Sequence, residues 1–331
     1  MKRTHASTKL ITTVLALLMP FFMSCQPSAP ESSKRTIVIG MVAKSQSNPV
    51  FQAAYTGAKD AAKELGDLYD ANIEIDWQTP PDEDAQKQAE AIEQLARRGV
   101  DGIIVSCSDA NAVTPAINKA IELGTPVMCF DSDAPQSKRL YYYGTDDITC
   151  GKTIMTELAK IMGEKGTIAI LAGNQSAPNL QNRTKGVMEE LKKYPDMKLL
   201  ENGVFYHEET PEQAAEAVNR AQSTNPDIQG WAMIGGWPLF TKNALKWNPG
   251  DIKVVAVDAL PPQLSYLESG HVQTLYAQDC YGWGFKSVDI LLRKILKNEE
   301  PASPRIIDPL TRVTKETAKE YGQKWDKWLG R

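Results

Sequence analysis

Charged and amide side chains follow the apolar runs of this 331-residue chain, at the points where the runs end. Asp131 and Asp133 follow the run PVMCF, Asp258 follows VVAV, and Lys44 and Asn48 follow IVIGMVA. A carboxylate accepts hydrogen bonds, whereas an amide both donates and accepts them. These residue types favour either the binding of a polar ligand or proton transfer by paired acids.

Paired acids are the basis for a hypothesis of enzymatic activity. Asp131 with Asp133, or Glu208 with Glu209, would serve as general acid and base. However, the sequence has no glycine-rich phosphate loop, metal-binding cluster or nucleophile motif, and its 3 histidines lie far apart. We therefore expect a binding protein, not an enzyme, with no cofactor and no metal.

Apolar runs and helical faces alternate along the chain and predict two similar halves. We expect strands at residues 37–43, 73–77, 102–106, 126–130, 167–172, 199–206, 230–234 and 254–257. We expect helices at residues 51–65, 85–96, 113–123, 153–162, 183–191, 211–223 and 238–246. This alternation is typical of α/β proteins in which helices cover both faces of a doubly wound parallel sheet. Such sheets bind ligands beyond the carboxyl ends of their strands, where the polar residues lie.

The N-terminal segment has the parts of an export signal. Lys2 and Arg3 provide a basic start, residues 10–22 form a short apolar run, and Ser24 is a small residue before Cys25. The run is shorter than the ~20 residues that a membrane span needs. A buried core helix is the alternative, but a proline interrupts the run and a polar stretch follows it.

Residues 22–25 (FMSC) resemble a bacterial lipobox, with Phe22 in place of the usual leucine. The resemblance implies a signal peptide over residues 1–24 and lipidation of Cys25, which becomes the mature N-terminus. Residues 25–35 then form a lipidated tether rich in proline and serine. We expect an exported protein anchored by lipid to the bacterial cell membrane, facing the periplasm or the exterior.

Charge and cysteine usage exclude other classes. The net charge is −4 and acidic and basic residues are mixed, so no basic stripe indicates nucleic acid as a partner. Cys107 and Cys129 follow or end neighbouring predicted strands. The two expectations for this pair are a disulfide and, in better agreement with the spacing of all the cysteines, buried thiols.

The chain resembles the type 1 periplasmic binding proteins of the ribose- and galactose-binding group over residues 35–313. The resemblance is carried by SNPVF at 47–51, TPV at 125–127, DSDAP at 131–135, GTD at 144–146, NPD at 225–227, VD at 257–258 and AQ at 277–278. It implies two lobes joined by three crossovers near Thr145, Asp279 and Asp308. The N-terminal lobe would contain residues 36–145 and 279–307, and the C-terminal lobe residues 146–278 and 308–331. Residues 314–329 are expected to form a helix that packs on the second lobe.

The same resemblance implies a set of ligand-binding residues. Asn48, Asp131, Asp258 and Gln278 match positions that hold sugar hydroxyls; Phe51 and Trp237 would cover an apolar sugar face; Lys44, Asn179 and Gly236 match positions near furanose-like ligands; and Asp133 and Arg183 complete the set. Ser132 and Gln181 replace arginines of the ribose binders, which implies a less basic pocket and argues against ribose, glucose and galactose.

Several of these residues also have structural interpretations. Asp131 would accept bonds within its loop or cap a helix, and Lys44 would form an ion pair with Asp131 or Asp133. Trp237 would pack in the core, Gln278 would join the lobes, and Arg183 would be a surface charge.

The resemblance implies a monomeric transport receptor that captures a sugar, polyol or furanose. It would deliver this ligand to the transmembrane subunits of an ABC permease. The alternative is a sensory protein of the same fold that reports the ligand to a chemoreceptor or histidine kinase. Both would use the same closure of two lobes.

Overall fold

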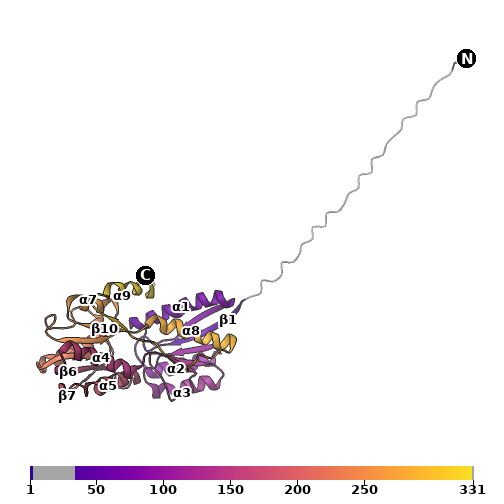
Figure 1. The fold of residues 1–331 in the computed structure, drawn as a ribbon. Coiled ribbons are helices and arrows are strands. Elements are labelled where there is room, and N and C mark those ends of the chain that lie inside the picture. Colours follow the sequence, from indigo (N-terminus) through magenta and orange to yellow (C-terminus); the bar gives the residue numbers. More distant parts are fainter. Residues whose placement is uncertain (3–33, 330–331) are drawn as a thin grey trace. The chain divides into compact units, whose positions relative to one another are not determined.

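The computed structural model describes residues 1–2 and 34–329, so the predicted signal peptide and Cys25 lie outside the described residues. The compact unit begins at Lys34 and is built on two six-stranded sheets (Figure 1). No helix among the described residues is long and apolar enough to cross a membrane.

The first lobe is built on a sheet with the order β11-β5-β4-β3-β1-β2, in which all strands are parallel. Its strands are β1 (Arg35–Val42), β2 (Ala71–Trp77), β3 (Gly102–Val105), β4 (Val127–Phe130), β5 (Tyr141–Gly144) and β11 (Arg305–Ile307). Its helices are α1 (Pro49–Tyr69), α2 (Ala85–Arg97), α3 (Ala110–Glu122) and α8 (Cys280–Lys297). Helices α1 and α8 pack together, as do α2 and α3, so helices cover both faces of the sheet.

The second lobe repeats this plan with the order β12-β10-β9-β8-β6-β7. Its strands are β6 (Lys165–Gly173), β7 (Asp196–Tyr206), β8 (Ile228–Met233), β9 (Lys253–Val257), β10 (Thr274–Ala277) and β12 (Thr311–Val313). Its helices are α4 (Asp147–Met162), α5 (Pro178–Leu191), α6 (Pro211–Thr224), the 3-10 turn η1 (Trp237–Phe240) and α7 (Pro261–Ser269). Strand β12 is antiparallel to β10, and the other strands are parallel. The predicted fold class, two doubly wound parallel-sheet lobes, is confirmed.

Close helix packing depends on glycine in both lobes. A side chain at Gly57 of α1 would collide with the carbonyl of Tyr281 in α8, and one at Gly151 of α4 would collide with the carbonyl of Arg183 in α5. Within each pair, α1 with α8 and α4 with α5, the two helix backbones are therefore in direct contact. These two pairs hold the pocket residues Phe51 and Arg183.

The chain passes between the sheets three times, and these passages are bonded to one another. Thr145 Oγ1 donates to Gln278 Oε1 at 2.9 Å, and the Asp308 amide donates to the Gly144 carbonyl at 2.8 Å. The passages therefore lie side by side, close to the carboxyl ends of β5 and β10.

The helix predicted over residues 238–246 is wrong, because only the η1 turn forms there. Tertiary hydrogen bonds occupy the backbone that a helix would use. The Ala244 carbonyl accepts from Asn219 Nδ2 at 2.6 Å, and the Ala244 amide donates to Tyr266 Oη at 2.8 Å. Contacts with α6 and α7 therefore override the helical pattern of this segment.

The C-terminal segment forms α9 (Ala318–Trp328), shorter than predicted. Trp325 Nε1 donates to the Ala259 carbonyl of the second lobe at 2.7 Å, and the Trp328 ring stacks on Tyr281 of α8 at 6.2 Å. Helix α9 thus contacts elements of both lobes.

Candidate ligand-binding site

The carboxyl ends of the two sheets enclose an inner cavity of about 30 Å³. Its lining includes Lys44, Asn48, Phe51, Asp131, Asn179, Arg183, Trp237, Asp258 and Gln278, together with Val50, Leu180, Glu209, Gly235 and Trp283. The structure therefore brings together all the predicted site residues except Asp133 and Gly236.

Asp131 and Asp258 occupy equivalent positions in the two lobes. Asp131 follows β4 and its amide donates to the Tyr143 carbonyl at 3.1 Å, while Asp258 follows β9 and its amide donates to the Tyr276 carbonyl at 2.9 Å. Both backbones are left-handed, with φ of 54° and 68°. The repeated turn directs one buried carboxylate from each lobe into the same cavity.

One oxygen of each carboxylate is held by a neighbouring side chain. Ser106 Oγ donates to Asp131 Oδ2 at 2.7 Å, and Gln278 Nε2 donates to Asp258 Oδ1 at 2.9 Å. The other oxygen of each makes no hydrogen bond to a side chain of residues 34–329. Each aspartate is therefore fixed in orientation and retains an oxygen that can accept from a ligand hydroxyl.

Burial raises the pKa of both aspartates. For Asp131 the raising effect is opposed by the charges of Lys44 and Arg183, and for Asp258 by the Gln278 hydrogen bond and by Arg183. The cost of burying these carboxylates is thus offset by nearby cations and donors, as buried charges require.

Arg183 is not a surface charge but the centre of a buried network. Its Nε donates to Asp147 Oδ1 at 2.9 Å, its Nη2 to Gln278 Oε1 at 2.8 Å and its Nη1 to the Ile234 carbonyl at 3.2 Å. Gln278 Oε1 also accepts from Thr145, so the Gln278 amide nitrogen is turned toward Asp258. Arg183 therefore positions Gln278, which combines an interlobe bond with a place in the cavity wall.

Gln181 lies outside the lining of the cavity, although it was, with Ser132, the basis for predicting a less basic pocket. Helix α5 buries Asn179, Leu180 and Arg183 on one face, whereas Gln181 is exposed and bonds to the Gln175 carbonyl. Arg183, which belongs to the predicted ligand set, lines the cavity instead.

Lys44 contacts the opposite lobe, in a pairing that differs from either ion pair proposed from the sequence. Its Nζ lies 3.6 Å from Glu209 Oε1, and the two side chains are 3% and 10% exposed. Burial would lower the pKa of Lys44, but the carboxylates of Glu209, Glu83 and Asp131 raise it above its usual value. Lys44 is therefore a permanent cation between the lobes.

Asp133 and Gly236 lie outside the lining of the inner cavity. Asp133 is held by Arg139, with Nη2 at 2.6 Å from Oδ2, and by Arg305 at 3.6 Å. A side chain at Gly236 would meet Gln263, and the neighbouring Gly235 lines the cavity instead. The structure therefore favours a structural role for both predicted residues.

Aromatic side chains form the apolar part of the lining. Phe51 packs against Trp283 with ring centroids 6.1 Å apart, and His207 meets Trp237 edge-on at 4.9 Å. Phe51 and Trp237 are 3% and 4% exposed. Core packing and a place in the cavity wall, which the sequence offered as alternatives for Trp237, are therefore both observed for the two residues.

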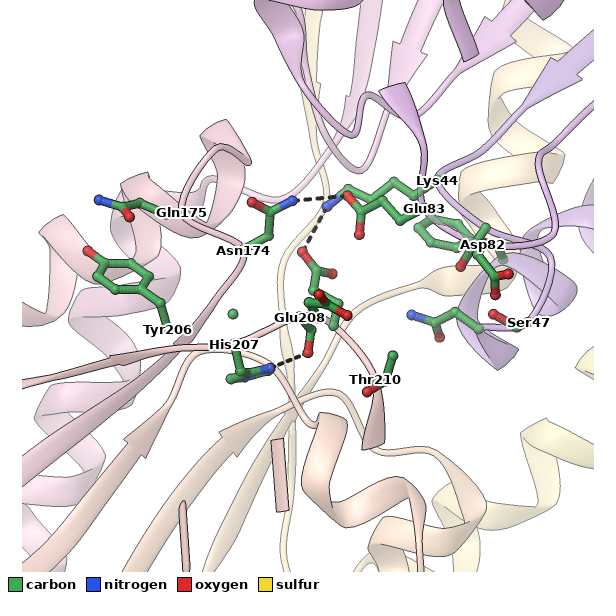
Figure 2. Close-up of a pocket in the computed structure, with 15 residues that line it drawn as sticks. Lys44, Ser47, Asp82, Glu83, Asn174, Gln175, Tyr206, His207, Glu208 and Thr210 are labelled. Carbon is green, nitrogen blue, oxygen red and sulfur yellow. Dashed lines mark hydrogen bonds and ion pairs between the residues drawn. The ribbon is translucent and has the colours of Figure 1, made fainter. Parts of the chain in front are cut away.

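An outer cavity of about 650 Å³ opens beside the inner one (Figure 2). It is lined by Ser45, Ser47, Asp82, Glu83, Gly173, Asn174, Gln175, Tyr206, His207, Glu208 and Thr210, and it shares Lys44, Asn48, Phe51 and Glu209 with the inner cavity. The shared residues form the wall between the two spaces. Figure 2 shows Lys44, Glu83 and Asn174 converging at this wall.

The cysteine pair, Asn48 and potential metal ligands are the remaining candidate features. Cys107 and Cys129 are free buried thiols with their sulfur atoms 3.9 Å apart. Asn48 Oδ1 caps α1 by accepting from the Val50 amide at 3.2 Å, while the residue also lines both cavities. No cluster of three potential metal-ligating side chains occurs in the part of the chain that the structure describes.

Comparison with known families agrees with this arrangement. The family model described as the periplasmic binding protein domain matches residues 39–300. This chain belongs to the periplasmic binding protein family. The matching family model describes a binding domain rather than an enzyme.

Relatives within the periplasmic binding protein family are known from sequence. The chain is 29% identical to the xylitol-binding protein of Mycolicibacterium smegmatis over 60% of this chain and 57% of that protein. It is 25% identical to the D-ribose/D-allose-binding protein of Pseudomonas aeruginosa, over 82% of this chain and 86% of that protein. The matches to the first three curated relatives span only 57%, 58% and 60% of their lengths.

Solved structures of the family superpose well. An ABC transporter solute-binding protein from Burkholderia graminis C4D1M, in complex with D-arabinose, has a TM-score of 0.77 at 29% identity and covers 87% of this chain and 99% of its own. A periplasmic solute-binding protein from Actinobacillus succinogenes 130z with bound D-allose has a TM-score of 0.75 at 25% identity, covering 86% of this chain and 100% of its own.

Some members of the cavity wall are missed by sequence reasoning. Trp283 lies in α8, a helix that was not predicted, and Glu83 lies in the acidic segment 82–84 that reads as solvent-exposed. Glu209 reads as a helix-capping acid before Pro211. The position of Glu209 just after the carboxyl end of β7 was the one available signal.

Proposed function

We propose that this chain captures a neutral sugar or sugar-like polyol between its two lobes and delivers it to an ABC importer. The observation that carries the proposal is the pair Asp131 and Asp258, one buried carboxylate from each lobe, both lining one cavity. Vicinal hydroxyls suit such acceptors, and the aromatic wall suits the apolar face of a sugar ring. The ligands in the names of the relatives support the same class.

Binding requires movement of the lobes. The inner cavity of about 30 Å³ has the volume of roughly one water molecule, whereas ligand pockets are usually about 300–1,000 Å³. A sugar ring therefore enters when the lobes separate, and the lobes that close over it must leave more room than they do in this structure. Movement about the three adjoining chain passages would provide this opening.

The ligand is neutral because the cations of the cavity are already engaged. Arg183 bonds to Asp147, Gln278 and a carbonyl, and Lys44 lies among three carboxylates. A carboxylate or phosphate on the ligand would face Asp131 and Asp258 without a free cation to compensate it. Sugar acids and sugar phosphates are thus expected to be rejected.

A thermal-shift panel tests this function. The chain from Lys34 to Arg331 would be heated with xylitol, D-ribose, D-apiose, D-allose or D-arabinose, and with D-arabinonate and ribose 5-phosphate as charged counterparts. We expect at least one neutral ligand to raise Tm by several degrees, since binding at 100 times Kd adds about 2.7 kcal/mol to stability. No shift with any neutral compound, or a shift with the charged counterparts alone, would contradict the proposal.

The proposed anchor is a lipid at Cys25. The substitution Cys25→Ser keeps the size of the side chain but removes the thiol that would carry the lipid. We expect it to move the protein from the membrane fraction to the soluble exported fraction of the host. Uptake of the ligand found in the panel should fall with the loss of the tethered protein. A Cys25→Ser protein that stays with the membrane, or a deletion strain that keeps normal uptake, would count against anchoring and transport respectively.

A further inference from the structure

Charged side chains from both lobes meet at the wall between the inner and outer cavities. Lys44 follows β1 and Glu83 follows β2 in the first lobe; Asn174 follows β6 and Glu209 follows β7 in the second. Each lies just beyond the carboxyl end of a strand, in a segment that faces the other lobe. This cluster occupies the route between the two cavities, because Lys44 and Glu209 line both.

Two contacts of this cluster join the lobes. Lys44 Nζ lies 3.6 Å from Glu209 Oε1, and Asn174 Nδ2 donates to Glu83 Oε1 at 3.5 Å (Figure 2). Lys44 and Glu209 are almost fully shielded from water, with exposures of 3% and 10%. An ion pair at this depth is screened little by salt, unlike a pair at the protein surface.

Separation of the lobes breaks both contacts and returns their groups to water. We propose that Lys44, Glu83 and Glu209 form an interlobe latch that closes the mouth of the cleft over the ligand. The ligand role rests on the proposed function, but the closure itself is a property of the protein alone. Glu83 acts as a positioning residue, since it contributes to the charge around Lys44 without lining the inner cavity.

The latch places more acid than base in one small volume. Glu83 and Glu209 surround one ammonium group, and Asp131 adds a third carboxylate to its field. Burial raises the pKa of Glu83 to about 7; Lys44 lowers it, Glu209 raises it, and Ser108 and Asn174 lower it by hydrogen bonding. A proton on Glu83 therefore removes the cost of burying its charge in the closed cleft and, to a smaller extent, its repulsion with Glu209.

Closure of the latch is expected to depend on pH. In the open protein Glu83 faces water with its ordinary pKa of 4.5, whereas in the closed protein its pKa is about 7. Between these values closure takes up a proton, so closure strengthens as the pH falls from about 7 and levels off below 4.5. His207 faces the same outer cavity, but burial lowers its pKa, so that its charge opposes closure at low pH.

The closing experiment needs no ligand. The radius of gyration of the purified chain from Lys34 to Arg331 would be measured by small-angle X-ray scattering from pH 8 to pH 5. We expect a more compact protein at pH 5.5 than at pH 8. The variant E83Q should be compact at both values, because its amide carries no charge that closure would have to bury.

Matched variants separate the latch from general effects. The neighbouring D82N, which also removes one acid from the outer cavity, should keep the wild-type profile. The variant H207Q should keep the pH response and close somewhat more strongly at low pH, because its amide has no charge that opposes closure. The variant E209Q should stay open across the range, because Lys44 loses its partner in the other lobe. A radius that does not change with pH in the wild type, or a pH response that survives E83Q or disappears in H207Q, would overturn the latch.

Binding then gives a second, independent readout. With the neutral ligand found in the panel, we expect about tenfold tighter binding at pH 6 than at pH 8, mostly through slower dissociation, and a flat profile in E83Q. A ligand that binds without this dependence contradicts the latch alone. A protein that compacts with falling pH but binds no neutral sugar contradicts the proposed function alone.

Discussion

Asp131→Asn is expected to weaken sugar binding by about 10- to 150-fold while leaving the protein folded. Hydrogen bonds to a charged group contribute about 1.5–3 kcal/mol, and each 1.4 kcal/mol is about tenfold in Kd. The asparagine amide still fits the space and can accept from Ser106, but it lacks the charge that strengthens bonds from sugar hydroxyls. Isothermal titration with the neutral ligand found in the panel measures the loss.

The stability of Asp131→Asn should be equal to or slightly above that of the wild type at pH 7. Burial raises the pKa of Asp131, so the folded protein holds the ionised carboxylate less favourably than the unfolded chain does. At a pH above that pKa, the charge of Asp131 lowers the free energy of unfolding of the wild type. The asparagine carries no charge, so the variant does not lose this part of the stability. A variant that loses binding because it has unfolded would be recognised by its urea transition.

Asp133→Asn provides the matched control. The same change two residues later removes a partner of Arg139 and Arg305, so we expect a loss of about 1–3 kcal/mol in stability with affinity nearly unchanged. If Asp133→Asn abolished binding, or if Asp131→Asn bound the sugar with wild-type affinity, the assignment of the two aspartates would be wrong.

Arg183→Met is expected to lower the free energy of unfolding by about 3–5 kcal/mol at pH 8. Arg183 and Asp147 are 3% and 8% exposed, and removing the arginine leaves a buried carboxylate without its cation. Gln278 also loses the donor that orients it, so sugar binding should weaken as well. Urea denaturation followed by circular dichroism measures the change in stability.

The loss in Arg183→Met should be smaller at pH 5 than at pH 8. Burial raises the pKa of Asp147 to about 7 even with Arg183 present, and without Arg183 the pKa rises further. At pH 5 the folded variant therefore keeps Asp147 protonated, whereas the unfolded chain ionises it, so the penalty grows as the pH rises. The second change Asp147→Asn should recover most of the stability at pH 8.

Arg220→Met serves as the control for removing an arginine. Arg220 pairs with Glu216, and both side chains are 73% exposed, so we expect a change below about 1 kcal/mol. A loss in Arg183→Met no larger than this, or one that does not vary with pH, would show that the buried pair does not stabilise the fold as described.

The periodic parts of the fold were predictable, whereas the parts defined by long-range contacts were not. Helices such as α1 and α6 present a clear apolar face and were found within a few residues of their bounds. Strands β5 and β10 were not predicted, and each is held in place by pairing with a neighbouring strand, β4 or β9. The segment 241–246 looked helical, yet tertiary hydrogen bonds determine its path.

The candidate site shows the same division. Asp131 and Asp258 were found because each ends a recognisable strand, and the carboxyl ends of parallel strands collect ligand residues. Glu83 was missed because the segment PPDED has the composition of an exposed loop, yet its side chain is half-buried beside Lys44 and Asn174. The resemblance placed a pocket arginine of the ribose binders near Gln181, and a resemblance does not resolve which face of α5 is buried.

The left-handed backbone at Asp131 and Asp258 limits how this protein can diversify. With φ of 54° and 68°, these two positions suit glycine, asparagine and aspartate, and they disfavour β-branched and bulky residues. A lineage that evolves a new ligand specificity therefore has few possible substitutions at Asp131 and Asp258. Divergence would instead proceed at Phe51, Asn179 or Trp237, which lie in ordinary helical backbone around an unchanged pair of anchors.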